Sequence, residues 1–145
     1  MSVKKKVSFV VPVYRNEGAI KIFHKNLVEE LTSSLPELDY EIIFVNDGSD
    51  DNSYKEMHEV RAVDRKVKLI SLYRNFGQMG AIIAGWDHST GNAIMNVSAD
   101  MQEPPSQFVK MIQEWDNGYE VVIGTREKDR KSTRLNSSHQ IISYA

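Results

Sequence analysis

The sequence predicts an α/β fold with a Rossmann-like, doubly wound and mainly parallel sheet that carries helices on both faces. Short runs rich in valine and isoleucine recur along the chain, and stretches with helical spacing of apolar residues lie between them. Runs that are apolar at nearly every position are typical of strands buried on both faces of a parallel sheet. Their alternation with helices then gives right-handed βαβ units.

Five strands are expected along the chain. They are the runs Val7–Val13, Tyr40–Val45, Val67–Leu72, Ala93–Val97 and Tyr119–Ile123.

Four helices are expected between these strands. In the first, apolar residues recur every three or four positions, at Ile20, Phe23, Leu27 and Leu31. The second, over residues 52–64, has a less regular pattern. The last two follow the i, i+3, i+4, i+7 spacing, at Met79, Ile82, Ile83 and Trp86 and at Phe108, Met111, Ile112 and Trp115. Pro105 and Gly118 are suited to the start and the end of the last helix.

The composition describes an ordinary globular protein. A length of 145 residues suggests one domain, and the net charge of -2 gives no field that would favour nucleic acid. The absence of cysteine excludes disulfides, a thiolate nucleophile and a cysteine zinc site. No apolar run approaches the ~20 residues of a membrane-spanning helix, and the amino-terminal stretch does not resemble a signal peptide. We therefore expect a cytoplasmic protein.

The last stretch of the chain differs from the rest. Residues 131–145 are rich in serine and asparagine and have no amphipathic period. They resemble the translated sequencing-adapter DNA found at the end of truncated genes. We therefore expect the domain to end at about residue 130 and residues 131–145 to be non-native or disordered, with a functional C-terminal peptide as the alternative. Resequencing the gene beyond the codon for Arg130 decides between them, because a native reading frame through Ala145 would exclude the artefact.

Acids, amides and glycines gather after the carboxyl end of each expected strand. The segments are 12–17, 46–51, 74–78, 98–105 and 124–126. In an open parallel sheet, ligands bind outside these strand ends, near the point where the strand order reverses. The loops that lead from a helix to the next strand lack this density of polar residues. The rim formed by the five segments is therefore predicted to be a binding site.

Each rim segment also has a purely structural interpretation. Asp47, Gly48 and Ser49 could form only a turn and a helix cap. Asp100 could cap the helix that follows it, and Arg74 could pair with a surface carboxylate. The coincidence of such segments at successive strand ends favours the binding site. No dinucleotide-binding, P-loop or nucleophile-elbow motif is present, which argues against those enzyme classes.

Four rim segments resemble family 2 glycosyltransferases, which have the GT-A fold. They read Val-Val-Pro-Val-Tyr-Arg-Asn-Glu at 10–17, Val-Asn-Asp-Gly-Ser-Asp-Asp-Asn-Ser at 45–53, Arg-Asn-Phe-Gly-Gln at 74–78 and Ala-Asp-Met-Gln-Glu-Pro-Pro at 99–105. The resemblance covers about residues 5–130 and is nearest to the branch of dolichol-phosphate mannose synthase and the bacterial polyprenyl-phosphate glycosyltransferases. It implies that residues 1–130 are the amino-terminal part of a truncated GT-A domain that binds a nucleotide-diphospho-sugar donor.

The resemblance implies a nucleotide-binding role for six residues. Pro12 and Tyr14 would form a wall against the nucleobase, and Glu17 would accept a hydrogen bond from the nucleoside. Asp47 would accept the imide N–H of uracil or guanine, a strong hydrogen bond because the acceptor is charged. Arg74 and Gln78 complete the set.

The resemblance also implies a metal site, with Mg²⁺ or Mn²⁺ as the cofactor. Asp100 matches the second acid of the family's Asp-x-Asp motif and would bind the ion, with Gln102 completing its shell. Asp100 is implied to be catalytic, as is Arg126, which would lie near the phosphates. Ser98 replaces the first acid of the motif, so metal binding is expected to rely more on the donor diphosphate.

The implied reaction is transfer of a sugar, with inversion, to a lipid phosphate or a glycan. The full-length parent would then be membrane-associated. Two alternatives stay open: a nucleotide-sugar-binding fragment without turnover, and a nucleotidyltransferase. The second would need a glycine-rich segment with a nearby lysine after the first strand, and the segment at 12–17 does not supply it.

Overall fold

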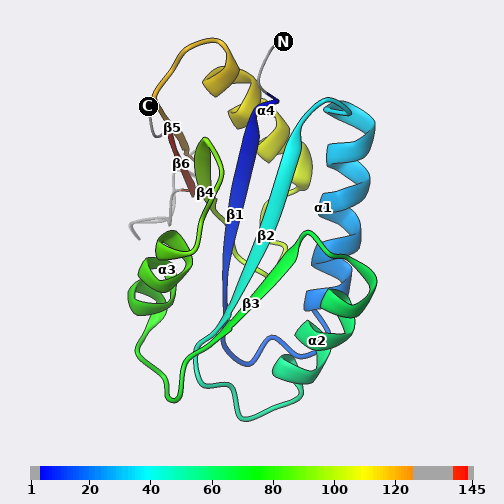
Figure 1. The fold of residues 1–145 in the computed structure, drawn as a ribbon, viewed down its shortest axis with the longest axis vertical. Coiled ribbons are helices and arrows are strands. Elements are labelled where there is room, and N and C mark those ends of the chain that lie inside the picture. The colour runs from blue at the N-terminus through cyan, green and yellow to red at the C-terminus, as the bar shows by residue number, and fades with distance from the viewer. Residues whose placement is uncertain (1–3, 126–138, 144–145) are drawn as a thin grey trace, which may run out of the picture.

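The computed structural model describes residues 4–125 and the backbone of residues 139–143. The strands are β1 (Lys6–Val13), β2 (Asp39–Asn46), β3 (Val67–Ser71), β4 (Ala93–Asn96), β5 (Val121–Gly124) and β6 (His139–Ser143). The helices are α1 (Ile20–Ser34), α2 (Ser53–Val63), α3 (Gln78–Asp87) and α4 (Pro105–Asp116). The strands form one sheet in the order β3-β2-β1-β4-β6-β5 (Figure 1).

The first four strands form the expected parallel sheet. β1 pairs in parallel with β2 on one side and with β4 on the other, and β2 pairs in parallel with β3. The chain therefore builds outward from β1 in one direction and then returns to add β4 on the opposite side. This reversal of strand order lies between β1 and β4, and their carboxyl ends mark the place where such sheets bind ligands.

The strand β6 is not among the expected strands. It lies between β4 and β5 and is antiparallel to both, with Ile94 opposite Ile142 and Val122 opposite Ile141. Its pairing depends on residues far away in the sequence, which a local pattern does not register. The strand comes from the stretch assigned above to a tail, and the domain boundary at residue 130 stays a prediction.

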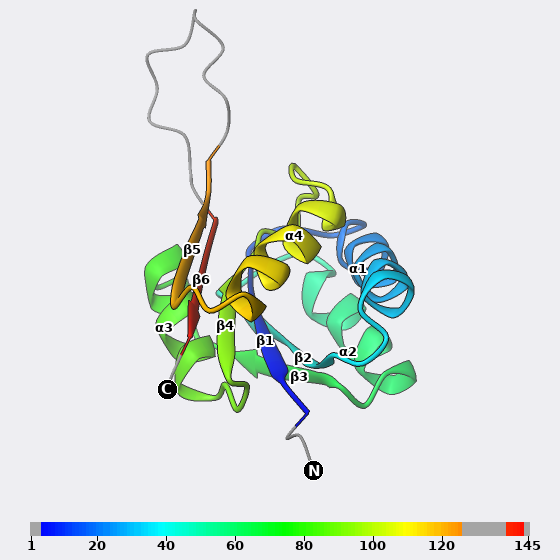
Figure 2. The same ribbon diagram turned by 90° about the horizontal axis from the view of Figure 1, so that it is seen from above.

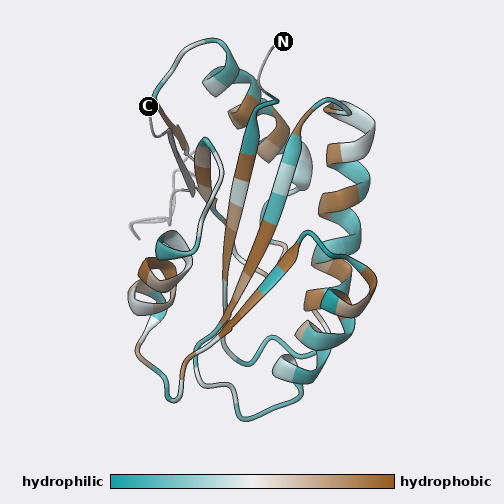
Figure 3. Ribbon diagram, in the orientation of Figure 1, coloured by the Kyte–Doolittle hydropathy of each residue, from teal (hydrophilic) through white to brown (hydrophobic). Residues whose placement is uncertain are grey.

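Helices cover both faces of the sheet, as expected. α1, α2 and α4 lie on one face and α3 on the other (Figure 2). Hydrophobic residues fill the central strands, whereas the loops after β1 and β2 are largely hydrophilic (Figure 3). On the first face, the rings of Phe23 and Phe44 meet edge to face with their centroids 6.1 Å apart. No helix in residues 4–125 has the length and apolar character needed to cross a membrane.

The helical spacing predicts the buried faces of α1 and α4 correctly. The residues expected on one face of each helix are buried: Ile20, Phe23, Leu27 and Leu31 in α1, and Phe108, Met111, Ile112 and Trp115 in α4. Pro105 lies in the first turn of α4, as expected. Gly118 follows the helix with a φ of +110°, which favours glycine at this position.

The helix α3 packs in a different way from the one its pattern suggests. Its buried residues are Ala81 and Gly85, whereas Met79 and Ile83 are 64% and 52% exposed. A Cβ atom on Gly85 would lie 2.3 Å from Cγ1 of Val10 on β1. The helix therefore approaches the sheet too closely for a large side chain at Gly85, and Met79 and Ile83 are turned away from the contact, whereas Trp86 packs at its edge.

A buried carboxylate stabilises the face of the sheet that α3 covers. Glu41 on β2 is 2% exposed and accepts hydrogen bonds from Oγ of Ser8 and the backbone N–H of Thr90, both at 2.6 Å. Its other oxygen lies 2.7 Å from Nζ of Lys68 and 3.1 Å from Nζ of Lys6. Burial by itself raises the pKa of Glu41, but these hydrogen bonds outweigh it and hold the pKa at about 2.

Candidate functional site

A pocket of about 240 Å³ lies at the carboxyl ends of β1, β2 and β4. Its lining includes Pro12, Tyr14, Asp47, Asn75, Gln78 and Ser98. These residues come from four segments that are distant in the sequence but lie at or just after the carboxyl ends of neighbouring strands. The pocket lies at the strand-order reversal, the position predicted from the sequence.

The pocket brings together four of the residues assigned above to nucleotide binding. Pro12, Tyr14, Asp47 and Gln78 line it. The remaining assigned residues that the structure describes do not line it: Glu17, Arg74, Asp100 and Gln102. Arg126 lies outside the described residues. The roles of all these residues stay predictions.

Asp47 joins three of the rim loops. Its side chain is almost fully buried, and its Oδ1 atom accepts a hydrogen bond of 2.7 Å from the backbone N–H of Phe76. Its own backbone N–H donates to the carbonyl oxygen of Val13 at 2.8 Å. Asp47 therefore fixes the loop after β3 and is also one of the residues that line the pocket.

Gly48 allows this close contact between loops. A Cβ atom at Gly48 would lie 2.5 Å from the backbone nitrogen of Asn75 and 2.6 Å from the carbonyl carbon of Arg74. Its φ of +73° is also in the left-handed region that favours glycine. Gly48 lies at a bend between β2 and α2, and no local sequence pattern indicates the neighbouring loop that presses against it.

The loop between β1 and α1, residues 14–19, is held by side chains that follow β2. The backbone N–H of Arg15 donates to Oγ of Ser49 at 3.1 Å, and that of Asn16 donates to Oγ of Ser53 at 2.9 Å. The backbone N–H of Glu17 donates to a carboxylate oxygen of Asp51 at 3.4 Å. Sequence reasoning missed this role, because each bond joins residues more than thirty positions apart.

Several rim acids are already paired with groups of the rim itself. Asp50 accepts two hydrogen bonds of 2.8 Å from the guanidinium of Arg15, and this hydrogen bonding lowers the pKa of the Asp50 carboxyl. Glu17 accepts a 2.7 Å hydrogen bond from the side-chain amide of Asn52 and a 3.4 Å hydrogen bond from the backbone N–H of Asn52. The position of Glu17 outside the pocket agrees with this use of its carboxylate.

An exposed cluster of aromatic rings and a cation lies in the segment after β3, next in the sequence to the pocket residues Asn75 and Gly77. The guanidinium carbon of Arg74 lies 4.4 Å from the ring centre of Phe76 and 5.7 Å from that of Tyr73. Tyr73 is 85% exposed. Within residues 4–125, Arg74 forms no salt bridge, so the surface ion pair considered for it above is not found there.

Asp100 lies in a tight turn after β4. Its Oδ1 atom accepts the backbone N–H of Gln102 at 3.2 Å, and Met101 between them has a φ of +60°. The residue that caps α4 is Pro104, and no side chain caps that helix. Asp100 is exposed and does not serve as the helix cap that was considered for it.

A complete protein-built metal site is not found in the part of the chain that the structure describes. No group of three or more His, Cys, Asp or Glu side chains there could hold an ion. The exposed carboxylate of Asp100, whose Oδ1 atom accepts the backbone N–H of Gln102, fits an ion that takes most of its ligands from phosphate oxygens and water.

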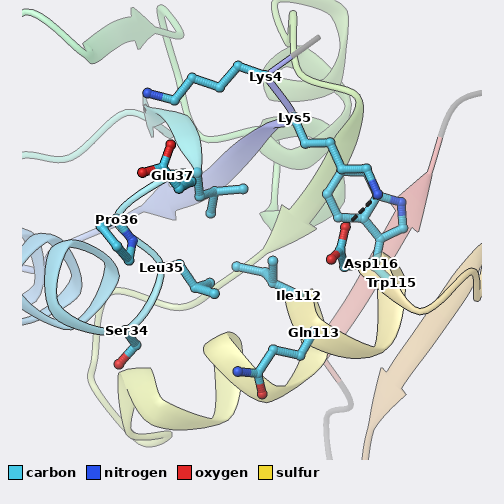
Figure 4. A pocket seen from close by; sticks show the side chains of 11 residues that line it. Lys4, Lys5, Ser34, Leu35, Pro36, Glu37, Ile112, Gln113, Trp115 and Asp116 are labelled. Atoms are coloured by element: carbon cyan, nitrogen blue, oxygen red, sulfur yellow. Dashed lines mark hydrogen bonds and ion pairs between the residues drawn. The ribbon is translucent and has the colours of Figure 1, made fainter. Parts of the chain in front are cut away.

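A larger cavity, of about 580 Å³, lies at the opposite end of the sheet (Figure 4). It is bordered by the end of α1, the loop before β2 and the end of α4, where Lys5 pairs with Asp116. None of the rim residues lines this cavity.

Known proteins resemble this chain over most of its length. The family model described as glycosyl transferase family 2 matches residues 8–144. The chain is 43% identical over 126 residues to the uncharacterized glycosyltransferase YkcC of Bacillus subtilis, covering 87% of this chain and 38% of that protein. It is 36% identical to the bactoprenol glucosyl transferase of Shigella phage SfX, covering 90% and 42%. It is 38% identical to the undecaprenyl-phosphate 4-deoxy-4-formamido-L-arabinose transferase of Proteus mirabilis, covering 88% and 39%. The chain thus spans about two fifths of the length of these relatives.

Solved structures share the fold. A mannosyltransferase from Pyrobaculum calidifontis, in complex with GDP-Man and Mn²⁺, superposes with a TM-score of 0.75 at 14% identity. That likeness covers 98% of this chain and 45% of the other. TarS of S. aureus, in complex with UDP, superposes with a TM-score of 0.61 at 20% identity, covering 90% and 38%. These likenesses confirm the predicted GT-A fold.

Proposed function

The chain belongs to glycosyl transferase family 2, and on this basis we propose that its rim pocket binds the nucleotide of a nucleotide-diphospho-sugar donor. The observation that carries the proposal is the convergence of Pro12, Tyr14, Asp47 and Gln78 on one pocket at the carboxyl ends of the strands. Neighbours of this fold have been solved with GDP-Man and with UDP, which supports the same ligand class. Family membership leaves the nucleotidyltransferase alternative without support.

Asp47 is the residue that would recognise the base. Its Oδ1 atom is used by the backbone of Phe76, so a ligand N–H would be accepted by the other carboxylate oxygen. Uracil and guanine both offer an imide N–H, and a charged acceptor gives one of the stronger hydrogen bonds in proteins. The half-exposed ring of Tyr14 beside it offers a stacking surface for the base.

Asp100 and Gln102 would hold Mg²⁺ or Mn²⁺ jointly with the donor diphosphate. A divalent ion bound there would neutralise the negative charge that develops on the diphosphate as it leaves. Ser98 lines the pocket in place of the family's first acid, so the chain brings a single negative charge from this motif. Arg126 would contribute a positive charge near the phosphates.

We propose that the full-length protein transfers the sugar, with inversion, to a polyprenyl phosphate at the cytoplasmic face of a membrane. The names of the bactoprenol and undecaprenyl-phosphate transferases among its relatives support this acceptor. A phosphate acceptor is already an anion and needs little help from a general base, whereas a glycan hydroxyl would require one. The alternative proposal, that this chain binds the donor without turnover, is tested by whether it releases nucleoside diphosphate from a bound donor.

Calorimetric titration with UDP and GDP, with and without Mg²⁺ or Mn²⁺, tests the proposal. We expect at least one nucleotide to bind, and to bind more tightly with metal. Asp47→Asn keeps an acceptor for Phe76 but presents an amide to the ligand, so affinity should fall by about tenfold or more. Asp100→Asn should remove the gain from metal.

Asp116→Asn is the matched control, because Asp116 pairs with Lys5 at the opposite end of the sheet. It should leave nucleotide affinity unchanged. Binding that is indifferent to both rim substitutions would refute the assignment of the pocket.

A further inference from the structure

Glu56 is a buried carboxylate with no role assigned so far. It lies in the first turn of α2 and is 8% exposed. Its Oε2 atom accepts the backbone N–H of Gly18 at 2.8 Å, and its Oε1 atom accepts that of Lys21 at 3.0 Å. Both oxygens are therefore directed at the backbone where the loop of residues 14–19 enters α1. Glu56 does not line the rim pocket.

The start of α1 needs such a partner. The residue at its N-cap is Ala19, which offers no side-chain acceptor, and the first N–H groups of a helix have no partner within the helix. A carboxylate near this end also interacts favourably with the helix dipole. Glu56 thus acts as a cap supplied by another helix, across thirty-five or more positions of sequence.

The same helix holds the loop at a second point. Ser53, also in α2 and fully buried, accepts the backbone N–H of Asn16. The side chain of Asn16 in turn accepts the backbone N–H of Tyr14 at 3.0 Å, and both residues line the pocket. Met57, next to Glu56, is fully buried in the core, so α2 is anchored in the core beside these contacts.

We infer that Glu56 is a positioning residue for the nucleotide pocket. It holds the loop of residues 14–19 in the conformation that places Tyr14 against the ligand, without touching the ligand itself. The effect of Glu56 on nucleotide affinity rests on the proposed donor binding. Its restraint of the loop of residues 14–19 is a property of the chain alone.

Amide hydrogen exchange of the chain without nucleotide tests the restraint directly. The N–H groups of Gly18 and Lys21 should exchange as slowly as those in the interior of α1, because both are bonded to a buried acceptor. Exchange at the rate of an open loop would overturn the inference, whatever the chain binds.

Glu56→Gln tests the consequence for binding. The amide keeps one acceptor but turns an NH₂ group toward the second backbone N–H, so one of the two bonds is lost. We expect exchange at Gly18 or Lys21 to accelerate, protection of β1 and β2 to persist, and the affinity for UDP or GDP to fall by about tenfold. Glu59→Gln, one turn further along α2, is the control, since exposed Glu59 pairs only with the side chain of Lys21 among the described residues.

The outcomes separate the two proposals. A wild-type chain that binds neither nucleotide contradicts the proposed function. A wild-type chain that binds, with Glu56→Gln binding equally well, contradicts the positioning role and leaves the proposed function standing. A loss of affinity in Glu59→Gln equal to that in Glu56→Gln would also overturn the positioning role. If Glu56→Gln does not fold, the exchange of Gly18 and Lys21 in the wild type decides.

Discussion

Replacing Glu41 by glutamine should remove a large, pH-dependent part of the stability. The carboxylate of Glu41 is 2% exposed and receives hydrogen bonds from Ser8 and Thr90 and two lysine contacts. Glutamine has nearly the same shape but no charge, so both lysines would face a neutral amide. The variant therefore isolates the contribution of the charge.

The magnitude follows from the pKa of Glu41. The pKa is about 2 in the folded chain against a usual value of 4.5. That difference, at about 1.4 kcal/mol for each pH unit, amounts to about 3 kcal/mol of unfolding free energy. Because the folded-state pKa is the lower one, this contribution is fully present above pH 4.5 and is lost as the pH falls toward about 2.

Urea denaturation followed by tryptophan fluorescence, repeated from pH 7 to pH 2, measures the effect. At pH 7 Glu41→Gln should be less stable than the wild type by about 3 kcal/mol, and the two should converge as the pH approaches 2. Glu29→Gln removes an exposed carboxylate that pairs with Lys25 at 4.0 Å, and should cost under about 1 kcal/mol at every pH. A difference between wild type and Glu41→Gln that stays constant from pH 7 to pH 2 would refute the reasoning.

Two glycine substitutions should test the two close contacts separately, one between loops at the pocket and one between α3 and the sheet. Gly48→Ala would place a Cβ atom within 2.5 Å of the Asn75 backbone, so we expect weaker nucleotide binding by calorimetry together with a loss of about 1–3 kcal/mol of stability. Unchanged affinity would contradict the close contact of the two loops. Gly85→Ala would press on Val10 in the sheet, so denaturation should reveal a loss of about 1–3 kcal/mol, whereas wild-type stability would argue against the tight packing of α3.

The sequence predicts most of the fold because the spacing of apolar residues within each short segment already identifies that segment as a helix or a strand. The strands β1 to β5 and all four helices lie within a few residues of their expected positions. In α1, the residues from Ile20 to Leu31 on the predicted face are the ones that pack. Such buried faces can be predicted from the sequence because, where a helix lies far enough from the sheet, its large apolar side chains fill the space between the two and are buried there.

The packing of α3 and the presence of β6 were not predicted, because both depend on contacts between residues far apart in the sequence, which no local pattern registers. In α3, Gly85 permits so close an approach to Val10 that small residues face the sheet and Met79 is left outside. In β6, pairing with β4 and β5 decides the conformation, and its short segment carries no signal that could be recognised alone.

The candidate site was predictable in position and less so in detail. Parallel strands bring their carboxyl ends to one edge, so the gathering of Pro12, Tyr14, Asp47 and Gln78 follows from topology. The hydrogen-bond partners of Glu17 and Asp51 could not be predicted from topology, because a carboxylate can accept a hydrogen bond from a ligand as well as from a group of the protein itself. Only the relative placement of the loops assigns these two acids to internal hydrogen bonds.

The pocket draws its lining from four segments spread between Pro12 and Ser98. An unfolded chain keeps these segments apart, so a nucleotide that fits the pocket has affinity for the native state alone. Mass action then makes the ligand a stabiliser: at a concentration one hundred times its dissociation constant it adds about 2.7 kcal/mol to the unfolding free energy. Melting temperature can therefore be used to screen candidate donors, without any knowledge of the acceptor.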